Sequence, residues 1–303
     1  MTEDAAIKQA LAERAARVEA WLAGRLAGES APEGLRRAME YSLLAGGKRI
    51  RPVLCLVSAE LFGLERDRAM PFACALECIH TYSLIHDDLP AMDDDDLRRG
   101  LPSCHKAFDE ATAILAGDGL LTGAFGLMTR CDLPPDRLLR TVALAAEAAG
   151  SAGMVGGQYL DIRFTGQKNV SLEEVAAMQA MKTGAMLRLA CEAGAVLAGA
   201  DEAGVSAMRV YGQAVGAAFQ ITDDILDETG SEAELGKPVG SDRDLRKNTY
   251  PAVLGLAASR EAALRHVDDA VRIVRTIRDM LPVPAAEAAL LEGLAAYIIK
   301  RVR

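Results

Sequence analysis

The residues best suited to chemistry in this sequence are two clusters of aspartates, each set within an otherwise apolar stretch. The first is HDDLPAMDDDDLRRG at residues 86–100, and the second is FQITDDILDETG at residues 219–230. Grouped carboxylates suit Mg²⁺, which keeps several waters and takes its remaining ligands from substrate phosphates. Neither cluster has the central glycine and terminal glutamate of an EF-hand loop, so that kind of Ca²⁺ site is excluded.

The second cluster has the spacing of one helix face. Asp223 and Asp227 are four residues apart, so their carboxylates lie about 40° from one another around a helix. Gln220 falls on the same stripe, and Asp224 flanks it. Because like charges at this spacing destabilise a bare helix, the sequence predicts a cation here.

The first cluster needs a break in its helix to work as one site. Asp87 and Asp93 are six residues apart, which would place them on different faces of an unbroken helix. Pro90 lies between them and predicts a distortion of the helix. That distortion would bring Asp93 back toward Asp87 and Asp88.

A plain alternative exists for any acidic run, because most such runs are solvated helix ends. That interpretation stays preferred for Asp94–Asp96, but two clusters within apolar helices favour a functional site. His80, Ser83 and Asp87 form a polar stripe on an otherwise apolar helix, which is typical of a cavity wall.

Several short basic clusters complement the aspartates. They are GGKRIRP at 46–52 (with Gly47, Lys48 and Arg51), Arg98–Arg99, Lys182–Thr183–Gly184, Lys237 and Lys247. Glycines before a helix start allow backbone N–H groups to approach an anion closely. Together the clusters predict two anion sites, one purely cationic and one bridged through Mg²⁺. That arrangement fits a reaction between two diphosphates, one of which departs with its charge stabilised by metal.

Helical periodicity runs through nearly the whole chain and predicts an all-α protein with one domain spanning residues 1–303. Gly, Pro and Ser mark the breaks, and Ser171 with Glu174 forms a capping box. The predicted helices cover about residues 4–27, 33–45, 51–62, 67–89, 105–130, 136–151, 153–163, 171–199, 203–228, 249–280 and 284–302.

Composition limits the classes of partner. The net charge is −9, which argues against nucleic acid as a ligand. The acidic start and the charges that interrupt apolar stretches such as 185–200 predict neither a signal peptide nor a membrane span. We therefore expect a cytoplasmic protein, with buried free thiols at its six scattered cysteines.

Six motifs, in this order along the chain, resemble those of the trans-polyprenyl diphosphate synthases, most closely the bacterial farnesyl diphosphate synthases. They are GGKRIRP (46–52), HDDLPAMDDDDLRRG (86–100), GGQYLD (156–161), MKTG (181–184), GQAVGAAFQITDDILD (212–227) and LGK…KNTYP (235–251). The resemblance covers about residues 41–255. It implies a bundle of about ten or more helices around a central cavity, Mg²⁺ as cofactor and a homodimer. The Ala- and Leu-rich segment 105–151 adds to the expectation of a homodimer.

The resemblance also implies a role for each motif residue. Three Mg²⁺ and the allylic diphosphate would be bound by the aspartates of both clusters, the end members of each triplet being direct ligands: Asp87, Asp88, Asp93, Asp223, Asp224 and Asp227. The same diphosphate would be held by Arg98, Lys182, Lys237 and Lys247. Isopentenyl diphosphate would be held by Lys48, Arg51, His80 and Arg99, beside Gly47. Gln220 and Thr183 would lie next to the allylic carbocation, with Lys182 completing the catalytic set.

Product length is predicted from Tyr82, five residues before Asp87, where an aromatic residue resembles the farnesyl synthases. Geranylgeranyl or geranyl diphosphate synthesis remains the alternative activity. The alternative interpretation of Tyr82 is that it is a plain residue of the hydrophobic core. A class I terpene cyclase would lack GGKRIRP and the second aspartate cluster. A non-catalytic partner subunit would lack aspartates from one cluster, and both are intact.

Overall fold

Helices make up almost all of the fold. The structure is a computed structural model that describes residues 3–26, 30–230 and 247–300. The α-helices are α1 (Glu3–Leu26), α2 (Glu33–Leu43), α3 (Ile50–Leu61), α4 (Arg66–Asp87), α5 (Cys104–Ala107), α6 (Glu110–Met128), α7 (Pro135–Ala149), α8 (Met154–Phe164), α9 (Leu172–Gln179), α10 (Ala185–Ala198), α11 (Glu202–Thr229), α14 (Tyr250–Leu254), α15 (Leu256–Met280) and α16 (Ala285–Lys300). A π-helical turn, η1 (Ala180–Gly184), and a hairpin of β1 (Leu97–Arg98) and β2 (Leu101–Pro102) complete it. The all-α prediction is confirmed.

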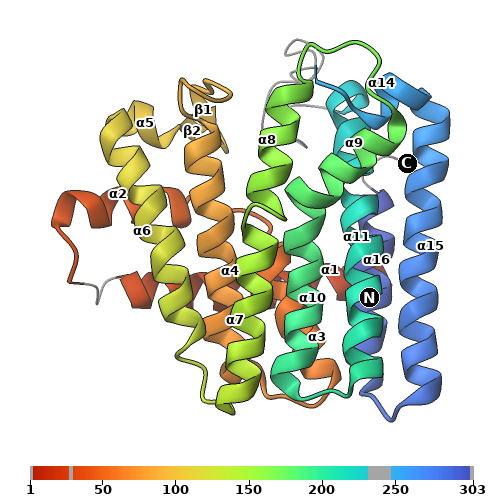
Figure 1. The fold of residues 1–303 in the computed structure, drawn as a ribbon. Coiled ribbons are helices and arrows are strands. Elements are labelled where there is room, and N and C mark those ends of the chain that lie inside the picture. The colour runs from red at the N-terminus through yellow and green to blue at the C-terminus, as the bar shows by residue number, and fades with distance from the viewer. Residues whose placement is uncertain (1–2, 27–29, 231–246, 301–303) are drawn as a thin grey trace.

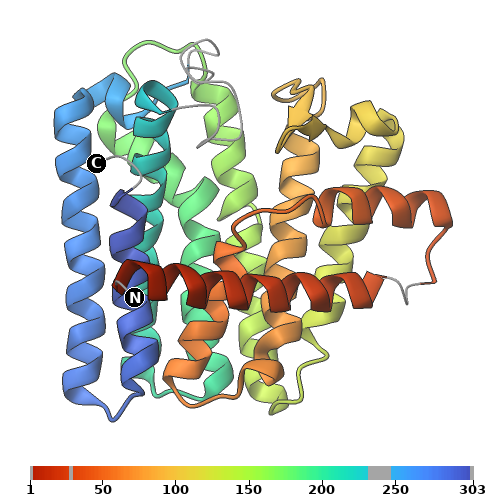
Figure 2. The same ribbon diagram turned by 180° about the vertical axis from the view of Figure 1, so that it is seen from behind.

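The long helices run side by side along one direction, with α4, α8, α10, α11 and α15 in succession across the bundle (Figure 1). From behind, α1 crosses the bundle nearly at right angles to these helices (Figure 2). α3 and α10 are buried along most of their length and lie inside, as expected of central helices. α15 instead buries one stripe that includes Ala263, Val267, Ala270 and Val274. The bundle therefore has an inner set of helices and an outer set.

Two predicted helices are each divided in two. The predicted helix 105–130 divides because Asp109 caps a new helix, its carboxylate accepting from the backbone N–H of Thr112 at 2.8 Å. The predicted helix 249–280 divides at Gly255, whose φ of +79° a helix cannot continue. The predicted capping box of Ser171 and Glu174 is present at the start of α9.

A π-helical turn interrupts the predicted helix 171–199 at η1, the segment that contains Lys182 and Thr183. Its backbone is held between two glycines of neighbouring helices. A Cβ on Gly157 of α8 would lie 2.1 Å from the backbone nitrogen of Lys182. A Cβ on Gly216 of α11 would lie 3.0 Å from the Cα of Gly184. The turn is thus packed on both sides against backbone that only glycine permits.

Two helical segments bear on the expectation that the chain has no membrane span. By length and composition, Glu110–Met128 and Pro135–Phe164 would be long and apolar enough to cross one. The sequence-based expectation takes residues 185–200 as its example and does not weigh these two segments as possible spans. A helix packed inside a protein passes the same test, and α6 lies along α4 (Figure 1).

Arg49 anchors the segment GGKRIRP inside the bundle. Its backbone is left-handed, with φ +49°, and its side chain is fully buried. The guanidinium donates to Glu77 at 2.7 Å, to Glu19 at 3.2 Å and to the carbonyl of Leu43 at 2.8 Å. Since Glu77 is also buried, the pair depends on both partners being present.

Replacing this arginine tests how far the fold depends on it. Arg49→Met leaves Glu77 as a buried charge without its cation, so we expect the free energy of unfolding to fall by about 3–5 kcal/mol. Urea denaturation followed by circular dichroism measures the change. The control is Arg17→Met, which breaks the exposed pair with Asp67 and should cost less than about 1 kcal/mol. Equal losses in the two variants would contradict the structural role of Arg49.

Candidate active site

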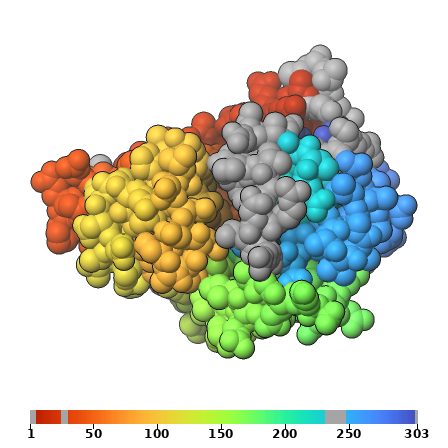
Figure 3. All heavy atoms as spheres, turned by 90° about the horizontal axis from the view of Figure 1, so that it is seen from above, coloured from red at the N-terminus to blue at the C-terminus, as the bar shows by residue number. Residues whose placement is uncertain are grey.

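The two aspartate clusters lie at the same end of the bundle. Asp87 is the last residue of α4, and Asp223 and Asp227 lie in the last two turns of α11. Both helices end at the upper edge of Figure 1. Seen from that end, the hairpin after α4 lies on one side of the molecule and α11 with α15 on the other (Figure 3). Helices far apart in sequence therefore present their carboxylates at one end.

A tight turn after α4 brings the later residues of the first cluster back toward Asp87. The backbone N–H of Asp93 donates to the carbonyl of Asp87 at 2.9 Å, and that of Asp94 donates to Leu89 at 3.2 Å. Asp94 takes a left-handed φ of +52°. Asp93 thus comes back to Asp87 as predicted, but through a turn beyond the helix end, since α4 stops at Asp87 and not at residue 89.

Asp87 is the electrostatic centre of the site. Burial raises its pKa to about 6, and the neighbouring Asp93 adds to the rise. Lys182, Arg98 and Lys247 act in the opposite direction on the same pKa. These residues come from η1, the hairpin and the segment before α14, so the fold brings three of the six motifs together at one carboxylate.

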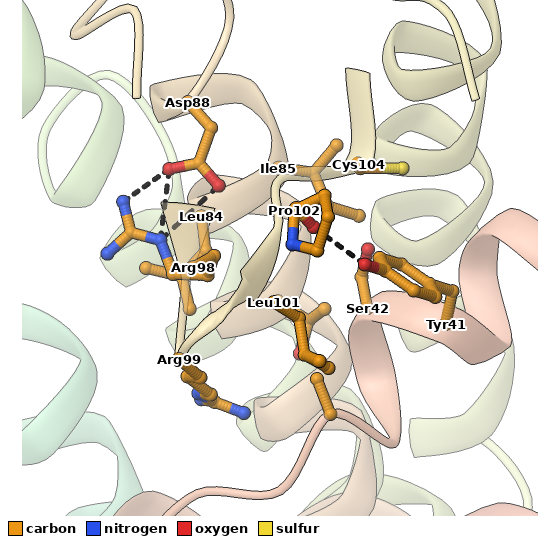
Figure 4. Close-up of a pocket in the computed structure, with 12 residues that line it drawn as sticks. Tyr41, Ser42, Leu84, Ile85, Asp88, Arg98, Arg99, Leu101, Pro102 and Cys104 are labelled. Atoms are coloured by element: carbon orange, nitrogen blue, oxygen red, sulfur yellow. Dashed lines mark hydrogen bonds and ion pairs between the residues drawn. The ribbon is translucent and has the colours of Figure 1, made fainter. Parts of the chain in front are cut away.

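Asp88 faces another way. Its buried carboxylate accepts from Nε of Arg98 at 3.0 Å and also from a terminal nitrogen of that guanidinium (Figure 4). Arg98 reaches Asp95 as well, at 3.2 Å. Burial raises the pKa of Asp88, and the hydrogen bond from Arg98 counteracts it. The pair borders a small pocket beside Tyr41 and Leu101.

Asp224, the middle aspartate of the second cluster, is likewise held by protein groups. Its buried carboxylate accepts from the side-chain amide of Gln179 at 2.7 Å and from that of Gln220 at 2.9 Å. The backbone N–H of Tyr250 donates to it at 3.0 Å. The hydrogen bond from Gln220 directs this side chain, which is predicted to lie beside the carbocation, toward Asp224.

Asp161 is a site residue that sequence reasoning missed. Its carboxylate, which is buried in α8, lies 2.6 Å from Nζ of Lys182 and 3.9 Å from Nζ of Lys247. Lys247 is also 3.4 Å from the carboxylate of Asp93. The sequence held a signal, because GGQYLD places this aspartate one turn after Gly157, which packs on Lys182.

Two of the cations predicted to hold the second diphosphate, Arg51 and Arg99, lie near His80. Burial lowers the pKa of His80 well below its usual value, and the charges of Arg51 and Arg99 lower it further. The guanidinium of Arg99 donates to the carbonyl of Gly46. A Cβ on Gly47, whose φ is +128°, would lie 2.8 Å from Cζ of Arg99. The glycine pair therefore packs directly on this arginine.

Arg51 carries an unmet hydrogen-bonding group. Its Nε is buried and finds no acceptor among residues 3–26, 30–230 and 247–300. Burial lowers the pKa of Arg51, while Glu77 and Asp223 raise it and Arg99 lowers it. A buried guanidinium with such a nitrogen suits an anion.

The remaining predicted residues have varied positions. Lys48 is exposed and borders a small pocket with Phe219 and Tyr297. Thr183 is half-buried in η1. Tyr82 is buried in α4, and its ring meets His86 edge-to-face at 5.7 Å. Lys237 lies outside the described residues.

The donor set fits Mg²⁺ in one particular way. In the part of the chain that the structure describes, no three acidic, His or Cys side chains lie close enough together to hold a metal by themselves. Asp87 nevertheless has a pKa raised by burial and by Asp93, a repulsion that a cation would relieve. The arrangement suits a hard cation that completes its coordination with waters and phosphate oxygens.

Comparisons with known proteins agree with this geometry. The model of the "Polyprenyl synthetase" family matches residues 32–279. The chain is 48% identical to the farnesyl diphosphate synthase of Geobacillus stearothermophilus, over 89% of this chain and 91% of that protein. It is 44% identical to geranylgeranyl pyrophosphate synthase 12 of Arabidopsis thaliana, over 89% of this chain and 75% of that protein.

A solved structure supports the same assignment. The FPP/GFPP synthase of Zymomonas mobilis superposes with a TM-score of 0.85 at 35% identity, covering 98% of this chain and 99% of that one. The family match includes both aspartate clusters, the glycine-rich basic segment and Asp161. This chain belongs to the polyprenyl synthetase family.

Proposed function

We propose that this chain is a farnesyl diphosphate synthase. It joins isopentenyl diphosphate to dimethylallyl diphosphate and then to geranyl diphosphate, in a single domain spanning residues 1–303. The observation that carries the proposal is the convergence of Lys182, Lys247 and Asp93 on Asp87, at the same end of the bundle as the cations around His80. Relatives named farnesyl diphosphate synthase support it.

Two groups of residues would hold the two substrates. Lys182, Lys247 and Arg98 lie beside the aspartates, where the allylic diphosphate departs, and Lys237 belongs to the same proposed set. Lys48, Arg51, His80 and Arg99 would hold isopentenyl diphosphate, beside Gly47. Burial and the neighbouring arginines hold the pKa of His80 well below its usual value, which favours the neutral ring as a hydrogen-bonding ligand.

Mg²⁺ would be held by the outer aspartates of each cluster, Asp87, Asp93, Asp223 and Asp227, with three ions as the proposed number. The metal supplies charge stabilisation for the departing diphosphate. Asp88 and Asp224, which the resemblance also assigns to the metal, are here held by Arg98, Gln179 and Gln220, and orient the outer pairs.

The reaction needs no protein nucleophile. The allylic carbon–oxygen bond breaks and leaves its electron pair on the diphosphate. The isopentenyl double bond then forms the new carbon–carbon bond to the cation. A proton leaves the adjacent carbon for the released diphosphate and restores a double bond. Thr183 and Gln220 are proposed to lie beside the cation, with Lys182 holding the released diphosphate in place.

We infer further that the protein is a homodimer that works in the cytoplasm. Large apolar side chains are exposed along α6, α7 and α8, among them Leu115, Leu139 and Tyr159. A surface of this kind marks an association site. All six cysteines are free and buried, as suits a reducing compartment.

The reaction is tested by incubating the purified protein with radiolabelled isopentenyl diphosphate, dimethylallyl diphosphate and Mg²⁺, and sizing the dephosphorylated products. We expect fifteen-carbon farnesol as the main product and no product with EDTA. Because protonated Asp87 cannot ligate a cation, the Mg²⁺ concentration at half-saturation should rise as the pH falls through about 6. Full activity in EDTA would refute the metal dependence, and a twenty-carbon product would favour the geranylgeranyl alternative.

Asp161→Asn tests the residue that links the two lysines. We expect kcat to fall about 100-fold, because Lys182 and Lys247 lose the charge that fixes them beside Asp87. Steady-state kinetics measures the change, and circular dichroism verifies folding. The matched control is Glu173→Gln, an exposed residue of α9, which should keep normal kcat. An unchanged kcat in folded Asp161→Asn would exclude this role.

Tyr82→Ala tests the floor of the proposed chain-elongation pocket. The phenol ring lies about a turn and a half of helix below Asp87. Its removal should shift the product from fifteen carbons toward twenty, since one more isoprene unit buries additional apolar surface. Chromatography of the dephosphorylated products measures the shift, and Tyr82→Phe should keep the fifteen-carbon product. A variant that still stops at fifteen carbons at normal rate would place the floor elsewhere.

The dimer is tested by light scattering at micromolar concentration. We expect twice the chain mass of 32.1 kDa. Leu139→Glu places a charge on the most exposed of the apolar side chains of α7 and should lower the measured mass toward that of one chain. The control is Val210→Glu on α11, outside this surface, which should remain dimeric. A wild-type mass of one chain would refute the dimer.

A further inference from the structure

A cavity of about 250 Å³ lies beside the active site but is not lined by its outer aspartates. It is bordered by α9, η1, α10, α11 and the first residue of α14, helices that pack together in Figure 1. Its walls are mostly alanine and glycine, among them Ala185, Gly216 and Ala217. The volume is just below the ~300–1,000 Å³ typical of pockets for drug-sized ligands, so its occupant must be small.

The cavity exists because α10 and α11 approach one another through small residues. A Cβ on Gly212 would lie 2.7 Å from the Cα of Arg188, and one on Gly216 would lie 3.0 Å from the Cα of Gly184. Short side chains permit this approach but cannot fill the groove that it leaves. The apolar part of the cavity therefore matches a short hydrocarbon body.

Arg188 supplies a charge to this apolar cavity. Its Nε is buried and has no acceptor among the residues that the structure describes. A terminal nitrogen of the same guanidinium lies 3.8 Å from the carboxylate of Glu147, which is 61% exposed. An ion pair this long to an exposed partner is weak, so the guanidinium remains suited to an anionic group in the cavity.

The same cavity touches the groups that hold the catalytic machinery. Gln179 and Gln220, which fix Asp224 between the two outer aspartates, are part of its wall. Ala180 and Met181 of η1 line it next to Lys182. An occupant would therefore contact both the support of the second aspartate cluster and the turn that carries the lysine.

We propose that this cavity binds a small amphipathic anion, with one carboxylate or phosphate group against Arg188 and a short apolar body against the alanines of α10 and α11. Binding there is coupled to diphosphate binding at the active site through Gln179, Gln220 and η1. The cavity is thus a regulatory site that borders the proposed allylic site at Gln220 but is lined by none of the described cations proposed to hold the two diphosphates.

Isothermal titration of the full chain with octanoate tests the binding. We expect one saturable site per chain, at least tenfold weaker in Arg188→Gln and for uncharged 1-octanol. Ala217→Leu fills the cavity and should weaken binding by at least tenfold, whereas Ala203→Leu, an exposed position of the same helix, should not. Octyl phosphate in place of octanoate identifies the preferred head group.

The outcome is decided even if one variant misfolds. Ala176→Leu fills the same cavity from α9 and replaces Ala217→Leu if circular dichroism shows that the latter is unfolded. No saturable binding to wild type, or unchanged affinity in a folded cavity-filling variant, would overturn the site. The titration needs no turnover, so a missing prenyl-transfer activity would refute the proposed function and leave this result untouched.

The coupling is tested by repeating the octanoate titration with saturating Mg²⁺ and inorganic diphosphate. We expect the dissociation constant to change at least threefold, and octanoate to change the affinity for diphosphate by the same factor. Equal dissociation constants with and without Mg²⁺ and diphosphate would overturn the regulatory role.

Discussion

The structure depends on a concentration of negative charge at the ends of two helices. Asp87 ends α4, and Asp227 lies in the last turn of α11, where the helix dipole already carries a negative partial charge. Aspartates at these positions repel one another and the helix ends that carry them. Three cations, Lys182, Arg98 and Lys247, lie near Asp87 and offset the burial and repulsion that raise its pKa.

The position of Lys182 depends on an unusual backbone conformation and on close packing against it. Lys182 reaches Asp161 from a π-helical turn, and that turn fits between α8 and α11 only because Gly157 and Gly216 lack side chains. Asp161 then shares its carboxylate with Lys247, which also approaches Asp93. A carboxylate outside both aspartate clusters thereby orients the charges that balance them.

The positions of the acidic residues could be predicted from the sequence more fully than the backbone features that support the site. The shared face of Asp223 and Asp227 followed from helical spacing, and the return of Asp93 followed from the need for a break near Pro90. The π-helical turn could not be predicted, since it arises from packing against two distant glycines. The spacing of GGKRIRP does not distinguish Arg49 from the neighbouring cations. Arg49 is buried because its left-handed backbone turns the side chain inward, and the residue pattern does not predict that conformation.

Both aspartate clusters use their middle member in the same way. Asp88 is held by Arg98, and Asp224 by Gln179, Gln220 and the backbone of Tyr250. A carboxylate that accepts several hydrogen bonds from the protein has little capacity left for a cation, but it fixes the helix end on which its neighbours stand. On the proposed function, one of two adjacent aspartates anchors the helix end and the other faces the substrate. On that proposal, the adjacent pair in each triplet supplies one carboxylate to the protein and one to the substrate, which a single aspartate at the helix end could not do.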